Sequence, residues 1–480
     1  MIRRPHAIRA AIVASVAALL GGVPTAAHAW ERRIQQAWAS YLLATDADGD
    51  VFTALPQKVH RSHELTVAVA KLSHERGREL WRRSLKVPGP EHSDTLAGLV
   101  VTADGDVIAA GGIEIEGRGE LVVTRLSGRT GRRLWQRVVR GAERPQSSDG
   151  ARSIVLDAAG DVVVAGWVES ETYVQYHGTQ DLAVVKLDAS DGRERWRFVL
   201  DGTAHSFDTA DHVAVDGAGD VLVVGQVFDD VSSPFALPAT TAFKLAGGTG
   251  VPLWRRSVPE LVDVRDLARA GDADLVLSGT ARLEDFSNDF GIVKLSGADG
   301  ARRWMASIGR SEDTWESALG VVVLPSGAVV GAGFVGDFDH EASFLVAAFD
   351  GTTGAERWRR ALEGSDAFGR AFAIAATPAG NVVAGGQLRN TGSCYDIAVV
   401  ELAGTTGDVL STRSFDGTTT ARLCDSTCEY RCRFTRDGID QDTLYGLTVD
   451  GQGRAVVAGT LDDGPRGKDR AFLSQFATSP

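Results

Sequence analysis

The chain has little of what most enzyme motifs are built from. Its 480 residues include 4 Cys, none adjacent to another, and 10 His, none in an HExxH or HxH arrangement. GxSxG and Walker-type phosphate loops are absent as well. The usual sequence signatures of zinc hydrolases, serine hydrolases and P-loop enzymes are therefore excluded.

Positive charge, long apolar runs and helical periodicity are also scarce. The formal net charge of −13 argues against a nucleic-acid-binding surface. After residue 29 no apolar run is long enough to cross a membrane. No segment of useful length has a 3.6-residue period, which excludes a helical solenoid. With 44% hydrophobic residues the chain can still bury a large core.

Residues 1–29 have the three parts of an export signal. Arg3, Arg4 and Arg9 precede the apolar segment 10–23, and Ala27-His28-Ala29 forms a small-x-small cleavage site. We therefore expect a mature protein that begins at Trp30 and is exported, to the periplasm or beyond it, with no transmembrane segment after signal removal. Residues 30–480 are expected to form one domain.

What the sequence has in abundance is repetition. The frame Ala348-x-Asp350-x-x-Thr353-Gly354-x-x-x-Trp358 finishes an apolar strand, makes a Gly-rich turn and opens a second strand with Trp. Similar frames recur every 50 to 61 residues. They end at Trp81, Trp135, Trp196, Trp254, Trp304 and, with the Trp replaced, at Ser411.

A hairpin turn followed by a Val-rich strand recurs eight times between these frames, from DADGDVFTAL at Asp46 to DGQGRAVVAG at Asp450. Each repeat reads as four short strands, which must stack on neighbouring repeats to bury both faces. β-Solenoid coils are usually shorter, so we predict an all-β, eight-bladed β-propeller with four antiparallel strands per blade. The last repeat lacks its Trp strand, and Trp30–Ile34 (WERRI) resembles that strand. We expect it to complete the last blade and close the ring.

The frame resembles the tryptophan-docking motif of the quinoprotein dehydrogenase-like eight-bladed propellers, the PQQ repeat. The hairpin segments are also similar to the bacterial propeller repeats named SBBP. The resemblance covers nearly all of residues 30–476 and implies that the frame Trp packs between adjacent blades. Because scaffold proteins of outer-membrane assembly carry the same frame, the resemblance leaves the chemistry open. Ser411 departs from the motif and puts the docking contact of blade seven in doubt.

Six tryptophans are assigned to structural docking: Trp81, Trp135, Trp196, Trp254, Trp304 and Trp358. An indole supplies a large apolar area and one N–H donor, which suits this packing. Trp167 and Trp315 lie off the frame. They are candidates for ligand binding, with partial burial in the core as the alternative.

Acidic residues recur twelve positions before the turn that precedes the second strand of several repeats. They lie in the connection that enters the innermost strand, at Asp94, Asp149, Asp208, Glu316 and Asp442. These carboxylates could ring one mouth of the central channel and bind a ligand there. The alternative is that each accepts backbone N–H bonds in its own turn. We assign no metal site.

The four cysteines lie in two connections that emerge on one face of the predicted ring. Cys394 follows the second strand of repeat seven, and Cys424, Cys428 and Cys432 lie in an insert at about 416–442. An even count in an exported protein favours disulfides, of which four cysteines allow three pairings. We predict one bond from Cys394 to the insert and one within it. A metal site is the alternative.

Two classes of function remain. The first is a non-catalytic binding or scaffold module without a cofactor, a monomer that binds a protein or cell-surface polymer through its loops but no nucleic acid. The second is a periplasmic oxidoreductase that depends on pyrroloquinoline quinone (PQQ) and calcium. By resemblance such an enzyme needs an adjacent Cys pair and long insertions, which this chain lacks. The first class is favoured.

Overall fold

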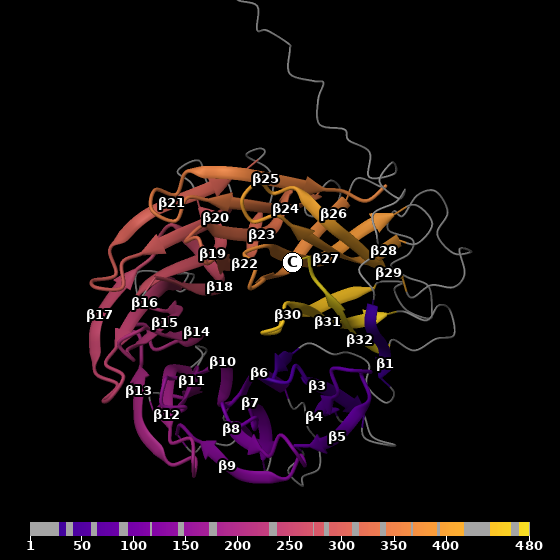
Figure 1. Ribbon diagram of the computed structural model, residues 1–480. Helices are drawn as coiled ribbons and strands as arrows, with labels where there is room; N and C mark the ends of the chain where they lie inside the picture. Colours follow the sequence, from indigo (N-terminus) through magenta and orange to yellow (C-terminus); the bar gives the residue numbers. More distant parts are fainter. Residues whose placement is uncertain are drawn as a thin grey trace, which may run out of the picture.

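The computed structural model describes sixteen segments of the chain and contains no helix in them (Figure 1). The described residues are 28–34, 42–58, 65–85, 95–115, 118–142, 148–171, 180–229, 238–271, 273–282, 288–309, 316–336, 342–365, 368–390, 394–416, 442–461 and 470–479. None of these residues forms a helix long and apolar enough to cross a membrane.

The described strands form eight sheets of four antiparallel strands, arranged as the blades of a propeller. Within a blade the first strand is innermost and the fourth outermost (Figure 1). Blades one to four comprise β2 (Leu43–Thr45), β3 (Val51–Lys58), β4 (Leu65–Leu72) and β5 (Glu79–Ser84); β6 (Thr95–Val101), β7 (Val107–Ile115), β8 (Arg118–Leu126) and β9 (Arg133–Val139); β10 (Gly150–Leu156), β11 (Val162–Glu169), β12 (Gln180–Leu187) and β13 (Glu194–Leu200); and β14 (Thr209–Val215), β15 (Val221–Val227), β16 (Ala239–Leu245) and β17 (Pro252–Ser257).

The other four blades repeat this order, except that the last takes its outer strand from the start of the chain. They comprise β18 (Leu261–Ala270), β19 (Asp274–Arg282), β20 (Asn288–Leu295) and β21 (Arg302–Ile308); β22 (Ser317–Val323), β23 (Val329–Gly336), β24 (Ala342–Phe349) and β25 (Glu356–Leu362); β26 (Phe368–Ala376), β27 (Val382–Asn390), β28 (Cys394–Leu402) and β29 (Val409–Phe415); and β30 (Thr443–Val449), β31 (Arg454–Leu461), β32 (Arg470–Ala477) and β1 (His28–Ile34).

The predicted ring closure is confirmed. β1 pairs with β32 in the outer position of blade eight, and Trp30 faces Gln475 in the register. β1 begins at His28, two residues before the predicted start of the mature chain. Continuous pairing runs from Trp30 to Ile34, because the register shifts between His28 and Trp30. The closing contact therefore does not require the residues before Trp30.

The core lies between blades rather than within any one of them. The two middle strands of each blade are runs of Val, Ala and Leu buried on both faces, as in β11 and β15. One cluster joins Val163 and Val184 of blade three to Val221 and Phe243 of blade four. A single blade would leave half of this apolar surface in water, so each blade requires its neighbours.

The frame tryptophans lie at these junctions. Each indole N–H donates to a backbone carbonyl in the turn between the third and fourth strands of the next blade, at 2.8–3.1 Å. The turn glycine permits the contact: Gly354 has φ +74°, and a Cβ there would lie 2.8 Å from the ring of Trp304. The pairs are Trp30 with His74, Trp81 with Gly128, Trp135 with Ala189, Trp196 with Gly247, Trp254 with Gly297, Trp304 with Gly351, and Trp358 with Gly404.

In several blades a basic residue on the third strand donates a hydrogen bond to the same carbonyl as the Trp. Lys186 Nζ lies beside Trp196 and donates to the same carbonyl, that of Gly247, at 2.9 Å. It also pairs with Asp157 of its own hairpin turn at 2.6 Å. Lys244 and Lys294 repeat the arrangement in blades four and five. The recurring Asp of the hairpin turn thus holds the cation that ties one blade to the next.

Blade seven replaces the docking Trp with a polar contact. Ser411 Oγ donates to Glu401, which stands where blades one to five carry a basic residue. The carboxylate of Glu401 also accepts the backbone N–H of Ser479 at 2.8 Å and the hydroxyl of the same residue at 3.0 Å. The end of the chain is therefore anchored at the junction where the motif fails.

Candidate functional site

The innermost strands share one irregularity. In blades two to eight the inner strand carries a β-bulge near its start, a residue left without a partner on the adjacent strand, which re-aims a side chain. The bulge lies three positions after the acidic residue identified in the sequence, as in Asp149 and Arg152. Blades two to eight place there, in order, Ala97, Arg152, Asp211, Arg265, Leu319, Phe372 and Tyr445.

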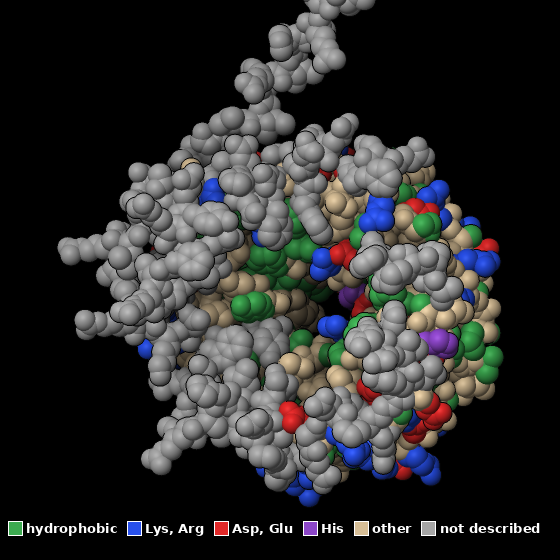
Figure 2. Space-filling view, turned by 180° about the vertical axis from the view of Figure 1, so that it is seen from behind, with side chains coloured by type: hydrophobic (Ala, Val, Ile, Leu, Met, Phe, Trp, Pro, Cys, Tyr) green, Lys and Arg blue, Asp and Glu red, His purple; other side chains and the backbone are tan. Residues whose placement is uncertain are grey.

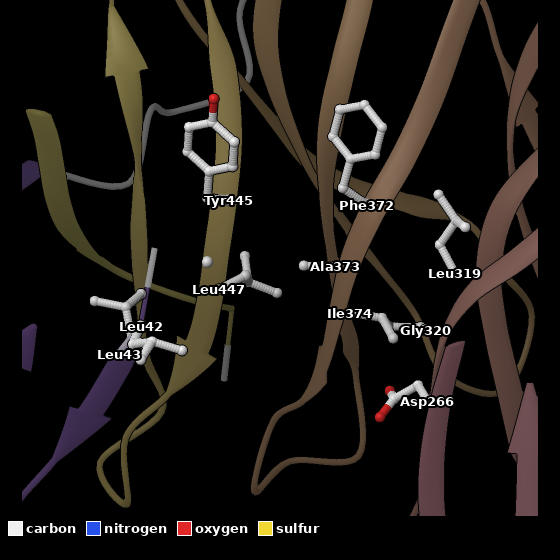
Figure 3. A pocket seen from close by; sticks show the side chains of 11 residues that line it. Leu42, Leu43, Asp266, Leu319, Gly320, Phe372, Ala373, Ile374, Tyr445 and Leu447 are labelled. Carbon is white, nitrogen blue, oxygen red and sulfur yellow. The ribbon is translucent and has the colours of Figure 1, made fainter. Parts of the chain in front are cut away.

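The bulge residues of blades six to eight line a central cavity of about 310 Å³. Leu319, Phe372 and Tyr445 contribute its apolar wall together with Leu42 and Leu447 (Figure 3). Tyr445 is 46% exposed, which is unusual for a large ring on an inner strand. The cavity therefore places accessible apolar side chains beside polar groups at the middle of the ring.

An aromatic cluster supports this wall from behind. Phe368 and Tyr395 meet edge to face with ring centroids 5.6 Å apart, and Leu319 packs against the group. The Arg370 guanidinium lies 4.7 Å from the centroid of the Phe368 ring. Such packing holds the inner strands of blades six and seven in fixed positions.

The same bulge position is charged in blades three to five. Arg152 lies 3.9 Å from Asp211, and Arg265 pairs with Asp263 at 2.6 Å. Burial raises the pKa of Asp211, and the Arg152 charge opposes that shift. Figure 2 shows hydrophobic side chains on one side of the central hollow and charged ones on the other. The inner ring therefore has an apolar arc and a charged arc.

One carboxylate lies among the cavity residues. Asp266 comes from the inner strand of blade five, directly after the bulge (Figure 3). Its Oδ1 accepts the N–H of Leu267 at 2.8 Å, and its Oδ2 accepts that of Val321, in blade six, at 3.0 Å. Burial raises its pKa to about 6, although these two bonds favour the charged form.

The acidic residues predicted from the repeat are buried at blade junctions, as far as the structure describes them. Asp149, Asp208, Glu316 and Asp442 are 0–3% exposed. Asp149 accepts the N–H of Glu169 and, at 3.0 Å, that of Gly141. Asp208 makes the same two kinds of bond, and Glu316 accepts the N–H of Gly336 at 2.9 Å. The donors Gly141 and Gly202 lie in the same connection as the acid, whereas Glu169, Phe228 and Gly336 lie twenty residues away, at the end of the second strand of the blade. Asp94 lies outside the described residues.

Trp167 lies near the charged arc. Its indole N–H donates to the carbonyl of Ser148 at 2.6 Å, and the guanidinium of Arg152 lies 4.9 Å from the ring centroid. Trp167 thus orients the bulge residue of its blade. Trp315 and three of the cysteines, Cys424, Cys428 and Cys432, lie outside the described residues. Cys394 begins β28, and only its backbone is described.

The bulge residues and Asp266 were not identified from the sequence. The sequence did contain a signal for the bulge residues: in five of the repeats the bulge residue follows the recurring acidic residue by three positions. A period-two strand pattern assigns such a residue to the wrong face, since it assumes regular pleating.

The described cavity residues do not fit a quinone with calcium. Among the residues that line the cavity, Asp266 is the sole carboxylate, and it already accepts two backbone N–H groups. The sequence has no adjacent Cys pair. We therefore assign no quinone-dependent step to this lining.

Residues 23–172 and 168–337 match the model of a family described as outer membrane protein assembly factor BamB. A comparison with curated protein sequences finds no match.

Several solved structures share the fold. Quinohemoprotein alcohol dehydrogenase ADHIIG from Pseudomonas putida HK5 is 13% identical with a TM-score of 0.55, over 95% of this chain and 77% of that one. Sqt1 from Chaetomium thermophilum, bound to the N-terminus of ribosomal protein L10, is 13% identical with a TM-score of 0.55, over 94% and 100%. The quinohemoprotein alcohol dehydrogenase from Comamonas testosteroni is 11% identical with a TM-score of 0.53, over 95% and 77%. At these identities the likeness shows the fold alone.

Proposed function

The chain belongs to the family of the outer membrane protein assembly factor BamB, and from this membership we propose that it is a non-catalytic binding propeller of the cell envelope. The observation that carries the proposal is the division of the inner ring into an apolar arc and a charged arc. A catalytic site needs converging polar groups, whereas this cavity offers an accessible apolar wall beside charges, as a protein-binding pocket does.

The ligand that fits is an extended segment of a partner protein. An apolar side chain of that segment would enter the cavity between Leu319, Phe372 and Tyr445. A charged group next to it would meet Arg265, which is 46% exposed and precedes the cavity residue Asp266. Buried aromatic contacts would supply most of the affinity, and the charges would set the orientation.

Fold alone does not decide between binding and catalysis, because the neighbours include both kinds of protein. Sqt1 is a propeller bound to the N-terminus of a ribosomal protein, and the alcohol dehydrogenases are enzymes. The choice rests on the residues of the cavity, which suit an apolar side chain and not a calcium-bound quinone.

Site-specific photocross-linking in the producing cells tests this proposal. A photoreactive amino acid at position 445 should cross-link to one protein, and peptide mapping should place the link in an extended segment beside an apolar residue. The same probe at Leu253, 53% exposed on the outer strand β17, should not capture that protein. Cross-links to polysaccharide alone would contradict the protein ligand. Dye-linked alcohol oxidation by the purified protein with added quinone and calcium would overturn the non-catalytic role.

We also propose that residues 1–29 are removed on export, that residues 30–480 act as a monomer, and that Cys394, Cys424, Cys428 and Cys432 form two disulfides. The basic, apolar and small-residue parts of the leader support cleavage before Trp30. Intact-mass measurement of the envelope protein, with and without reductant, tests the cleavage and the disulfides, and size-exclusion chromatography with light scattering tests the monomer. A chain that retains its first 29 residues, or that has four free thiols, would contradict them.

A further inference from the structure

Three carboxylates meet at the junction of blades three and four. Asp181 is the second residue of β12, Asp201 follows the last residue of β13, and Asp208 precedes β14. One oxygen from each lies within 4.8 Å of the others. Asp201 and Asp208 lie in the one connection between β13 and β14, and strand pairing brings Asp181 of β12 beside them.

Two oxygens in this cluster have no hydrogen-bond partner. Asp181 is only 7% exposed, and its buried Oδ1 accepts no hydrogen bond. The Oδ1 of Asp201 is also buried without a partner, while its Oδ2 lies 2.7 Å from Nδ1 of His205. A buried carboxylate oxygen without a donor costs free energy, and like charges at this distance repel. Burial raises the pKa of Asp181 to about 6; a hydrogen bond from Ser170 opposes this shift and the charge of Asp201 adds to it.

In blade two one of the three corresponding positions carries an arginine in place of an acid. There Glu120 and Asp149 stand where Asp181 and Asp208 stand in blade three, and Arg140 takes the place of Asp201. The Arg140 Nε lies 2.9 Å from Glu120 Oε1. This junction thus carries its own positive charge beside the acids. The junction of blades three and four has a third acid instead.

Blade seven repeats the all-acid version. Asp396, Asp416 and Asp442 occupy the three corresponding positions, and one oxygen of each again lies within 4.8 Å of the others. The two clusters stand four blades apart in a ring of eight, on opposite sides.

We propose that Asp181, Asp201 and Asp208 bind a calcium ion, and that Asp396, Asp416 and Asp442 form a second site of the same kind. Calcium takes oxygen ligands at about 2.3–2.6 Å, so two oxygens that share one ion stand at most about 5 Å apart. The three oxygens meet this limit. A carboxylate-only set selects a hard cation and disfavours zinc, which prefers nitrogen and sulfur.

Bound calcium would join a strand to the connection between two blades. It would join the third strand of a blade to the end of its fourth strand and to the entry of the next blade. In blade two the side chain of Arg140 already joins the end of the fourth strand to Glu120 of the third strand. The site lies apart from the central cavity, so its loss and the loss of partner binding can be told apart.

Isothermal titration calorimetry on the full chain, treated with EDTA and dialysed at neutral pH, tests the proposal. Calcium chloride should bind at two sites per chain, with a dissociation constant of about 10⁻⁴ to 10⁻³ M or tighter. Magnesium chloride should bind more weakly, and saturating calcium should raise the melting temperature. Asp181→Asn should remove one site or weaken it by about tenfold or more.

Glu120→Gln is the matched control, because it changes the equivalent acid at the junction that already holds Arg140. It should leave both calcium sites unchanged. If Asp181→Asn does not fold, Asp201→Asn at the more exposed corner, 24% exposed, provides the same measurement. Absence of calcium binding to the wild type, or an unchanged titration in the folded Asp variant, would overturn the proposal. In that case a proton shared among the three carboxylates would offset their repulsion.

Discussion

The outer rim and the inner ring of this propeller use the same repeated blade differently. On the rim, tryptophans from β1 and six other outer strands make one contact with the following blade, each time to a carbonyl of the same turn. On the inner strands the bulge residue changes from Ala97 to Arg152, Asp211 and Phe372. Contacts that close the ring must repeat, because every junction has the same geometry. The bulge position can vary from blade to blade, since it does not carry the contact that closes the ring.

The largest effect is expected on the rim. Trp196 is 8% exposed, and Trp196→Ala should lower the free energy of unfolding by about 3–5 kcal/mol, since it leaves a cavity between two blades. Guanidinium denaturation followed by circular dichroism measures this. The control is Trp167→Ala, which removes an indole from the inner side of blade three. Equal losses in the two variants would contradict the distinction between rim and ring.

A smaller effect is expected where the rim departs from its repeat. Glu401→Ala removes the acceptor of Ser411 and Ser479 and leaves partly buried donors unpaired. We expect a loss of about 1–3 kcal/mol in the same denaturation experiment. Glu356→Ala is the matched control, because its partner Arg359 is an exposed residue on the same strand. It should change stability by less than about 1 kcal/mol. If Glu401→Ala left the free energy of unfolding unchanged, blade seven would need no contact in place of the missing Trp.

The smallest effect concerns the inner ring and depends on pH. The pKa of Asp266 is raised to about 6 in the folded chain, above its ordinary value, so the folded state keeps this proton to higher pH than the unfolded state does. Its contribution to stability is present at low pH and is lost as pH rises from about 4 to about 6.

Asp266→Asn should not show that loss. Between pH 4 and pH 7 the wild type should lose about 1–2 kcal/mol more than the variant, in the same denaturation experiment repeated across pH. Other carboxylates titrate alike in both proteins, so the difference isolates Asp266. Parallel pH profiles for the two proteins would show that Asp266 has the same pKa in the folded and unfolded states, which would contradict this prediction.

The sequence by itself determined the number of blades, the strand order and the closure by Trp30–Ile34. These follow from repetition: a motif that recurs eight times demands eight equivalent environments, and an outer strand missing at one end must be supplied from the other. It also located Ser411 as the position where the docking contact changes.

Only the tertiary structure decided what the repeated polar residues do. Lys186 meets Asp157 and the carbonyl of Gly247 because strand pairing and blade stacking bring three segments together. Asp181, Asp201 and Asp208 converge for the same reason. The bulges shift the inner strands out of regular alternation, so spacing along the chain does not give the direction of Phe372 or Arg152. Local sequence sets the strands, whereas contacts between strands and blades set which charges meet.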